Sequence, residues 1–336
     1  MKKENCYQHL NLLEREEISR GLVLRQSLRA VAKRLGRSTS TISREVNQRN
    51  NGRFGYRAFQ AEKAAAKRYK NHYALKIKRI DQRTELKNYI LRKLKLRWSP
   101  EQIAQNLKKE YPDDKTMNVS HETIYTYLYL LPKGELRKEL LSYLRQKRAW
   151  RRTKRKNNII GANRGKIPGM ISIEERPKEV EDRIIPGHWE GDLIIGAKQQ
   201  SALGSIVERT TRLVILVPLK ARDALTIRRA FAREMKSLPK QVKRSLTYDQ
   251  GSEMTEHKLF SKNTKIKVFF AHPGSPWERG TCENTNGLIR GFFPKSTDFN
   301  QIPRKTIKQT QGLLNARPRK VLSWRTPSEV FNELLH

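Results

Sequence analysis

The sequence predicts a multidomain chain, with helices in its N-terminal part and an α/β domain in its C-terminal part. Its 336 residues exceed the usual size of a single domain. Apolar residues first recur at helical spacing, whereas from residue 185 onward short β-rich segments alternate with helical ones. We expect a helix-turn-helix domain over 1–70, a second helical domain over 71–150, a basic linker over 151–180 and the α/β domain over 181–336.

The composition indicates a polyanionic partner. The chain has 71 Lys and Arg against 33 Asp and Glu, a formal net charge of +38, and the basic residues cluster. Phosphate backbones attract such clusters, so DNA or RNA is the first candidate, and a generically basic protein is the alternative. Cys6 and Cys282 are too far apart for a disulfide framework or a zinc site, so any metal is expected to have oxygen ligands.

Neither a signal peptide nor a membrane span is expected. The first 17 residues lack a long apolar stretch, and the longest apolar run, 213–219, is far too short to cross a bilayer. We therefore expect a cytoplasmic protein without a membrane partner.

Residues 27–48 have the pattern of a helix-turn-helix. The inner face of the first helix follows the i, i+3, i+4, i+7 rule with Leu28, Val31, Ala32 and Leu35. Gly36 ends that helix, and Ser38 is a plausible N-cap for a second helix with Ile42 and Val46 inside. Residue types that read bases or contact phosphates lie on the outer side: Arg37, Ser40, Thr41, Arg44, Asn47 and Gln48. An ordinary helical hairpin with a solvated face is the alternative.

A second helical unit follows, and its role is open. Ser99, Pro100 and Gln102 form a strong helix start, and Ser120 would cap a further helix over 121–131. This pair could be another helix-turn-helix, a structural bundle or a dimerisation element. The stretch 143–156 has eight basic residues and no acidic one, which favours a basic helix end that contacts the DNA backbone over a merely solvated face.

Three carboxylates interrupt the pattern of the α/β part. Asp192 lies inside the strand segment 188–197, and Asp249 ends the strand segment "SLTYD". Glu283 lies about two turns into a helix that should begin at Ser275. Oxygen ligands without a His or Cys cluster suit Mg²⁺, with Mn²⁺ as a substitute, and two such ions can support in-line phosphoryl displacement. Each acid alone would be a solvated residue; their order on a strongly basic chain favours a catalytic role.

Two further acids compete for that role. Glu278 falls at the third position after Ser275, where a capping-box partner belongs, so we assign it a structural role. Glu190 shares a strand face with Asp192 and is assigned to the strand surface, although alternation alone does not exclude it. The helix face of Glu283 also carries residues that suit a phosphate close to the backbone, namely Arg279, Asn286, Gly287 and Arg290.

The three acids and their spacing resemble a known signature. Asp192, Asp249 and Glu283 are separated by 56 and 33 residues, which resembles the DDE signature of transposases and retroviral-type integrases. The segments "HWEGDLI", "YDQGSE" and "CENTNGLIRGFFPK", with the N-terminal "YQHLNLLEREEI" and "KRLGRSTSTISREV", resemble the insertion-sequence thirty family of bacterial transposases. The resemblance spans nearly the whole chain.

This resemblance implies a fold and a mechanism. It implies a ribonuclease H-like catalytic domain with a mixed sheet after an all-α helix-turn-helix region, and Asp192, Asp249 and Glu283 as metal-binding catalytic acids. Arg290 matches the basic residue that such helices present to DNA. Gln250 departs from the pattern, because many relatives in the wider integrase group have Asn there, so the details of that turn do not carry over.

The resemblance also implies the partners. The helix-turn-helix would bind the terminal inverted repeats of a mobile element, the catalytic domain would also engage target DNA, and a homodimer or higher homo-oligomer would form on the DNA in the bacterial nucleoid. Metal-dependent strand cleavage would be followed by strand transfer through attack of a 3′-hydroxyl on a phosphodiester. The alternatives are a DNA-binding regulator with an inactive domain and a nuclease that cuts without joining.

Overall fold

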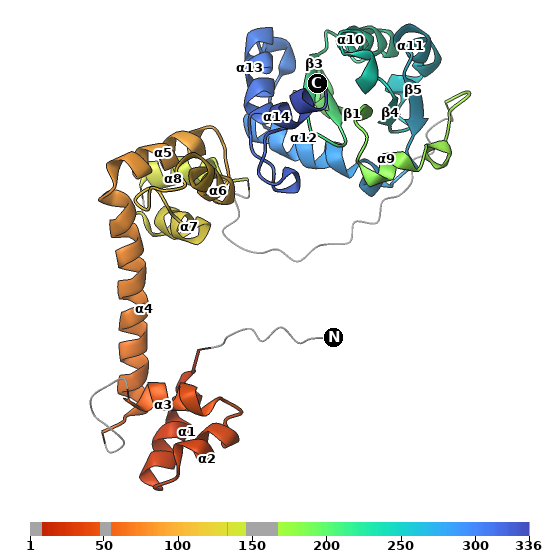
Figure 1. Cartoon of the computed structure of the whole chain (residues 1–336). Coiled ribbons are helices and arrows are strands. Elements are labelled where there is room, and N and C mark those ends of the chain that lie inside the picture. The colour runs from red at the N-terminus through yellow and green to blue at the C-terminus, as the bar shows by residue number, and fades with distance from the viewer. Residues whose placement is uncertain (1–8, 48–54, 133, 146–166, 336) are drawn as a thin grey trace. The chain divides into compact units, whose positions relative to one another are not determined.

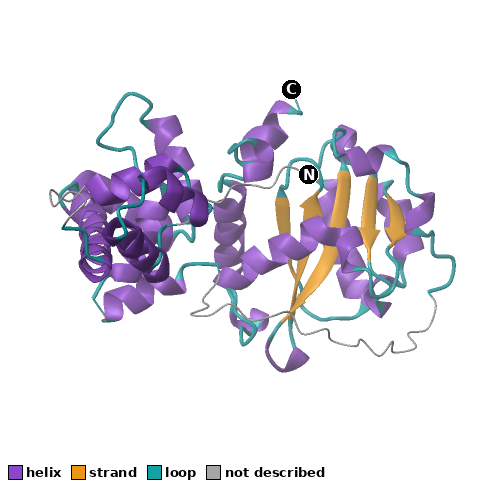
Figure 2. Ribbon diagram, turned by 90° about the horizontal axis from the view of Figure 1, so that it is seen from below, coloured by secondary structure: helices purple, strands orange, loops and turns teal. Residues whose placement is uncertain are grey.

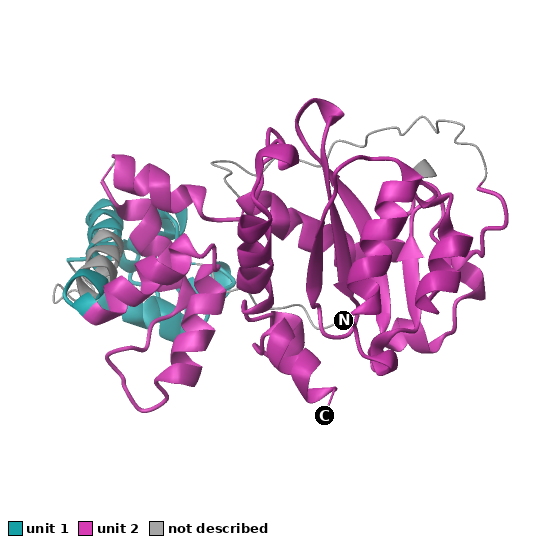
Figure 3. Cartoon of the chain, turned by 90° about the horizontal axis from the view of Figure 1, so that it is seen from above, with its two compact units in different colours: residues 1–84 teal, residues 85–336 magenta. Residues whose placement is uncertain are grey.

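The chain forms two compact units in a computed structural model that describes residues 9–47, 55–132, 134–145 and 167–335 (Figure 1). The first unit covers residues 1–84 and the second covers residues 85–336 (Figure 3). The division into four domains expected from the sequence stays a prediction.

The first unit is helical. Its helices are α1 (Leu12–Val23), α2 (Leu28–Arg34), α3 (Thr39–Asn47) and α4 (Ala58–Asp81). Asn11 and Glu14 form a capping box that begins α1, and the Ser27 side chain caps α2. A small apolar core holds the helices together, with Leu10, Ile18, Val31, Ala32, Ile42, Val46, Tyr56 and Ala61 buried.

The turn between α2 and α3 confirms the predicted helix-turn-helix. Gly36 has φ +61°, a left-handed conformation that glycine adopts without steric cost, and it stands where α2 must end. The Ser38 hydroxyl then accepts a hydrogen bond from the Thr41 amide at 3.2 Å and caps α3, as predicted. Ile42 and Val46 are fully buried, so the opposite side of α3 is left for solvent or a ligand.

The second unit begins with four further helices, α5 (Thr84–Lys95), α6 (Pro100–Glu110), α7 (His121–Leu130) and α8 (Glu135–Ser142). The predicted capping box of Ser99 and Gln102 is present, and Ser120 caps α7. The connection 111–120 between α6 and α7 is much longer than the tight turn between α2 and α3.

A five-stranded mixed sheet forms the centre of the remaining part (Figure 2). Its strands are β1 (His188–Ile195), β2 (Ala202–Glu208), β3 (Val214–Pro218), β4 (Ser245–Tyr248) and β5 (Lys267–Phe270). The order is β3-β2-β1-β4-β5; β1, β2 and β3 are antiparallel neighbours, whereas β4 and β5 run parallel to β1. A mixed sheet is what the resemblance to DDE transposases and integrases implied.

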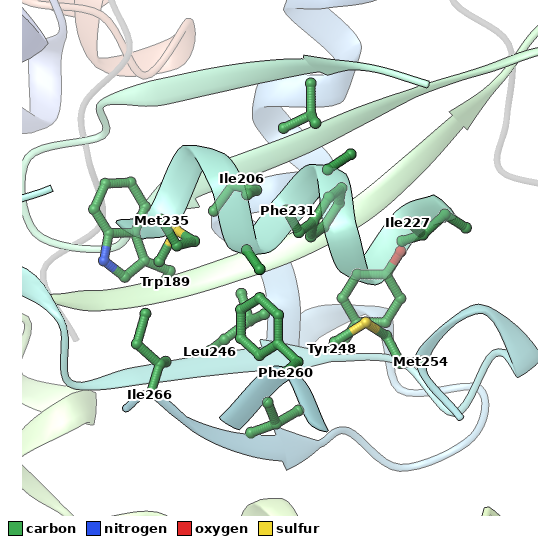
Figure 4. Close-up of a cluster of buried hydrophobic side chains, with 14 of the residues drawn as sticks. Trp189, Ile206, Ile227, Phe231, Met235, Leu246, Tyr248, Met254, Phe260 and Ile266 are labelled. Carbon is green, nitrogen blue, oxygen red and sulfur yellow. The ribbon is translucent and has the colours of Figure 1, made fainter. Parts of the chain in front are cut away.

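Each face of the sheet has its own apolar core. One core packs beneath α10 (Ala224–Lys236) and α11 (His257–Thr264), and contains Trp189, Phe231, Leu246 and Tyr248 (Figure 4). The other core packs beneath α12 (Gly280–Phe292) and α13 (Arg304–Asn315), and includes Ile194 and Cys282. Alternation along β1 thus sends Trp189 to one core and Ile194 to the other, so that Glu190 and Asp192 face α12.

Two short helices complete the unit. They are α9 (Glu179–Asp182), before the first strand, and α14 (Pro327–Glu333), whose Phe331 ring packs edge-on against Trp189 at a centroid distance of 6.4 Å. Within the described ranges, none of the helices combines the length and apolar character that a bilayer crossing requires.

Candidate active site

The parallel pairing of β1 with β4 brings two of the predicted acids together. Glu190 pairs with Thr247 in the register, and Asp192 and Asp249 each follow two residues later. Arg279 contacts both carboxylates: its Nη1 lies 3.4 Å from Asp192 Oδ1, and its Nη2 lies 3.6 Å from Asp249 Oδ2. The same guanidinium donates a hydrogen bond to the Gly191 carbonyl at 3.0 Å. The two acids therefore lie close enough to share one cation.

The Asp192 carboxylate is held in a fixed orientation by polar neighbours. Oδ1 accepts a hydrogen bond from the Leu193 amide at 2.9 Å, and Oδ2 accepts one from Asn286 Nδ2 at 2.7 Å. Ser205, the antiparallel partner of Asp192 on β2, donates to Asn286 Oδ1 at 2.8 Å. Burial raises the pKa of Asp192, although the charge of Arg279 opposes this, and Asp249 adds to the rise.

Gly191 allows the strands at this site to pack closely. A Cβ atom at this position would lie 2.7 Å from Cδ2 of Tyr248, the residue that precedes Asp249. The Tyr248 ring therefore packs directly against the backbone of β1. We infer that glycine beside Asp192 keeps the middle of β1 in contact with the end of β4.

The third acid, Glu283, lies in the first turn of α12 and is exposed. The sequence placed it about two turns into a helix, and this was wrong because residues 276–279 form a separate 3₁₀ turn before α12. The predicted capping box was also wrong: Ser275 makes no side-chain cap, and Glu278 accepts hydrogen bonds from the amide and ring of His272, both at 2.8 Å. Glu278 still has a structural role, but it holds the turn before the helix.

The sequence pattern assigned Glu190 to the strand surface, and this was wrong, because Glu190 is fully buried. Its Oε1 lies 2.6 Å from Arg209 Nη1, and its Oε2 accepts a hydrogen bond from the Cys282 amide at 2.8 Å. That amide is one of the free donors at the start of α12, where a negative charge is favourable. Glu190 therefore anchors the helix that carries Glu283. Alternation placed it on the correct face, but does not reveal that α12 covers that face.

Sequence reasoning put Arg279 and Asn286 on the face of Glu283, but did not predict that both contact Asp192. Their positions four residues before and three residues after Glu283 were the available signal. Arg290, seven residues after Glu283, is half-buried and donates to the Ile195 carbonyl at 2.6 Å from Nη2. It therefore lies at the end of β1.

The described part of the chain shows no group of three His, Cys, Asp or Glu side chains placed to hold a metal ion. Glu283 is thus not gathered with Asp192 and Asp249. The donor set nevertheless fits a divalent cation, because two carboxylates already share the positive charge of Arg279 and Glu283 lies exposed on the adjacent helix.

The candidate DNA-contact residues of the first unit have different surroundings. Ser40, Arg44 and Asn47 are exposed on α3, and Arg44 Nε donates to the Ser40 carbonyl at 3.2 Å. Thr41 is half-buried, with its hydroxyl 2.8 Å from that of Ser38. Arg37 Nε donates to Glu14 at 2.7 Å, and this hydrogen bond lowers the pKa of Glu14. Gln48 lies outside the described residues, as does the basic stretch from residue 146 onward.

Comparisons with known proteins agree with both the helix-turn-helix and the sheet domain described above. Residues 6–49 match a helix-turn-helix domain family, and residues 183–276 match the integrase core domain family. The chain is 43% identical to the transposase for insertion sequence element IS1086 of Cupriavidus metallidurans, over 98% of this chain and 96% of that protein. It is 40% identical to the transposase InsI for element IS30A of Escherichia coli K12, over 98% and 85%.

A search of solved structures also found a similar chain. The catalytic core domain of BIV integrase shares 17% identity with this chain at a TM-score of 0.35, over 45% of this chain and 96% of that one.

These family matches and relatives define the class of protein to which the chain belongs. The chain is a DDE-type enzyme of DNA transposition, with a helix-turn-helix for DNA binding and an integrase core for metal-dependent strand cleavage and transfer. It belongs to the IS30 family of insertion-sequence transposases. Neither a regulator with an inactive domain nor a nuclease that does not join is favoured by these relatives.

The buried pair of Glu190 and Arg209 yields a stability prediction. Glu190→Gln should lower the free energy of unfolding by about 3 to 5 kcal/mol, because Arg209 would stay buried without its carboxylate. Asp192→Asn, on the same strand face, should keep the wild-type stability, since burial already disfavours the charge of Asp192. Denaturant unfolding of both variants is the measurement, and equal stability of the two would contradict the anchoring role.

Proposed function

We propose that Asp192, Asp249 and Glu283 are the catalytic acids of this transposase and hold its divalent ions. The contact of Arg279 with both Asp192 and Asp249 carries the proposal, because one guanidinium already lies within 3.6 Å of both carboxylates. Glu283 completes the set from α12, whose start is fixed to β1 by Glu190.

Oxygen donors alone favour Mg²⁺, with Mn²⁺ as a substitute, and three carboxylates suit two ions. Such ions activate the attacking oxygen and stabilise the leaving oxygen of a phosphoryl transfer. The chain's own residues prepare the site: Asn286 keeps Asp192 oriented, and Ser205 keeps Asn286 in place. Arg290 brings a positive charge to the end of β1, where it can contact a DNA phosphate.

The substrate of the proposed reaction is double-stranded DNA at the ends of a mobile element. The exposed residues of α3, together with Arg37, Thr41 and Gln48, would read the terminal inverted repeats, and the integrase core would cut there. The freed 3′-hydroxyl then attacks a phosphodiester of target DNA. Because an element has two ends, we propose a homodimer or a larger homo-oligomer on DNA, at work in the cytoplasm at the bacterial nucleoid.

The first test removes the acids one at a time. Asp192→Asn, Asp249→Asn and Glu283→Gln should each abolish both cleavage and strand joining, since each removes a charged metal ligand, while end binding through the N-terminal unit is retained. The assay incubates full-length protein with labelled element ends and Mg²⁺, and quantifies cut and joined products.

Glu278→Gln is the matched control on the same stretch. Glu278 contacts His272 and neither of the two strand acids, so this variant should keep substantial activity. Joined product from Asp192→Asn at the wild-type level would refute the assignment of the strand acid. Cut product without joined product from the wild-type protein would support a nuclease instead.

A second test concerns Arg44 on the exposed side of α3. Arg44→Ala should weaken binding to element ends by about 1 to 3 kcal/mol if the guanidinium reads a base edge. A phosphate contact would instead weaken binding to all sequences equally and flatten the salt dependence. A titration at several salt concentrations measures both, and wild-type affinity with a wild-type salt slope would remove Arg44 from the interface.

A third test concerns the cation that the two aspartates share. In Arg279→Gln these carboxylates lose their positive neighbour, so the melting temperature without divalent ions should fall. Added Mg²⁺ should then raise it more than in the wild type, because the ion no longer competes with a guanidinium. Arg290→Gln is the control, since Arg290 contacts backbone carbonyls. Equal Mg²⁺-induced shifts in wild type and Arg279→Gln would show that the ion binds elsewhere.

A further inference from the structure

Four arginines gather on the α12 side of the second unit, and we call them the arginine cluster. Its members are Arg97, Arg145, Arg317 and Arg319. They come from three places in the sequence: the turn between α5 and α6, the end of the α8 region, and the segment between α13 and α14. Burial lowers the pKa of Arg317, and the charges of Arg319, Arg145 and Arg97 lower it further.

The cluster runs from the surface into the interior. Arg145 is exposed and Arg97 is half-buried, whereas the exposed fraction is 5% for Arg317 and 9% for Arg319. Arg317 Nε donates to Gln102 Oε1 at 2.8 Å, and Arg319 Nη2 donates to the Leu314 carbonyl at 3.1 Å. Arg319 Nε is buried and has no hydrogen-bond partner in the described structure. These acceptors are neutral, so they leave the positive charges uncompensated.

Throughout the described ranges, no carboxylate forms an ion pair with any member of the cluster. The sequence from residue 146 to residue 166, which follows Arg145, contains no Asp or Glu either. Other buried arginines of this protein are treated differently: Arg15 pairs with Glu45 at 2.9 Å, and Arg209 pairs with Glu190 at 2.6 Å. A buried charge without a counter-ion is costly, and convergent ones repel each other, so the cluster is suited to an external anion.

The cluster lies beside the helix that carries Glu283. Arg145 Nη2 donates to Asn284 Oδ1 at 2.6 Å, and the same atom lies 3.5 Å from where a Cβ of Gly287 would be. Arg97 Cδ lies 3.6 Å from where a Cβ of Gly291 would be, and Arg97 Cζ lies 5.5 Å from the centroid of the Phe292 ring. Because Gly287 and Gly291 have no side chains, they leave space on the surface of α12 next to these guanidinium groups. An anion bound there would be adjacent to the exposed Glu283.

We propose that the arginine cluster is a binding site for the phosphodiester backbone of the DNA on which this protein acts. Arg145 and Arg97 contact phosphates directly at the surface. Arg317 and Arg319 are buried and increase the positive electrostatic potential at that surface. The proposal rests on the proposed function, since it assigns the DNA to the Glu283 side of α12. It adds a contact region separate from the helix-turn-helix and from the acids.

The test is phosphate-ethylation interference with full-length protein and an element-end duplex, without divalent ions, so that no cleavage occurs. In the wild type, ethylation of phosphates near the cleaved end should block binding. Arg145→Gln should lose the interference at one or two of these phosphates. Its affinity should fall several-fold, and the slope of log Kd against log salt should decrease by about 1. Arg145 is exposed, so folding is not at risk.

Lys138→Gln is the matched control, because Lys138 is an exposed cation on α8 that already pairs with Glu135 at 2.8 Å. It should leave the interference pattern and the slope unchanged. If Arg145→Gln keeps the wild-type pattern and slope, the proposal is overturned. Cleavage and joining by the wild type, measured separately with Mg²⁺, show whether the proposed function stands when this inference fails.

Arg319→Met tests the buried part of the cluster. Without DNA it should melt at the wild-type temperature or above, because an uncompensated buried charge is replaced by an apolar side chain of similar length. With the duplex, its melting temperature should rise less than that of the wild type. A lower melting temperature without DNA, together with a wild-type rise on adding DNA, would mean that Arg319 only supports the fold and would overturn the assignment.

Discussion

The buried carboxylate of Glu190 is the interaction on which the arrangement of the catalytic part depends. It joins the side chain of Arg209, which follows β2 directly, to the Cys282 amide, one of the free donors in the first turn of α12. A carboxylate in the interior is stable only when its charge and its lone pairs are satisfied, and here a guanidinium and a helix N-terminus do both. The start of α12 is thereby fixed over β1. Glu283 follows Cys282 directly, so this one interaction sets where the third acid can lie.

The sheet topology supplies the other half of the site. β1 and β4 run parallel with Glu190 opposite Thr247, so Asp192 and Asp249 come together although 56 residues separate them. Bringing two carboxylates together costs electrostatic energy unless a cation accompanies them, and Arg279 provides that charge within the chain. In the proposed metal site, Arg279 would be the internal cation that a divalent ion replaces.

Most features that depend on residues a few positions apart were predicted correctly; the capping box expected at Ser275 is the exception. The caps at Ser38, Ser99 and Ser120 are examples, because a cap needs only the next turn of chain. Features that depend on tertiary partners were missed. The sequence gives no sign that α12 covers Glu190, or that a 3₁₀ turn moves Glu278 away from the cap position and towards His272. The ion pair of Arg37 with Glu14 likewise joins the turn between α2 and α3 to α1.

The excess of positive charge is also distributed according to a physical constraint. Seventy-one basic residues cannot all find partners among 33 acids, so some cations must lack one. Most can do so in water, where the cost is small. Arg317 and Arg319 lack a counter-ion in the interior, where the energetic cost is large. Neutral acceptors such as Gln102 reduce that cost only in part. The proposed DNA contact at the arginine cluster would relieve this repulsion and stabilise the interior. DNA binding should therefore tighten the packing of the α6 region against the segment that carries these arginines.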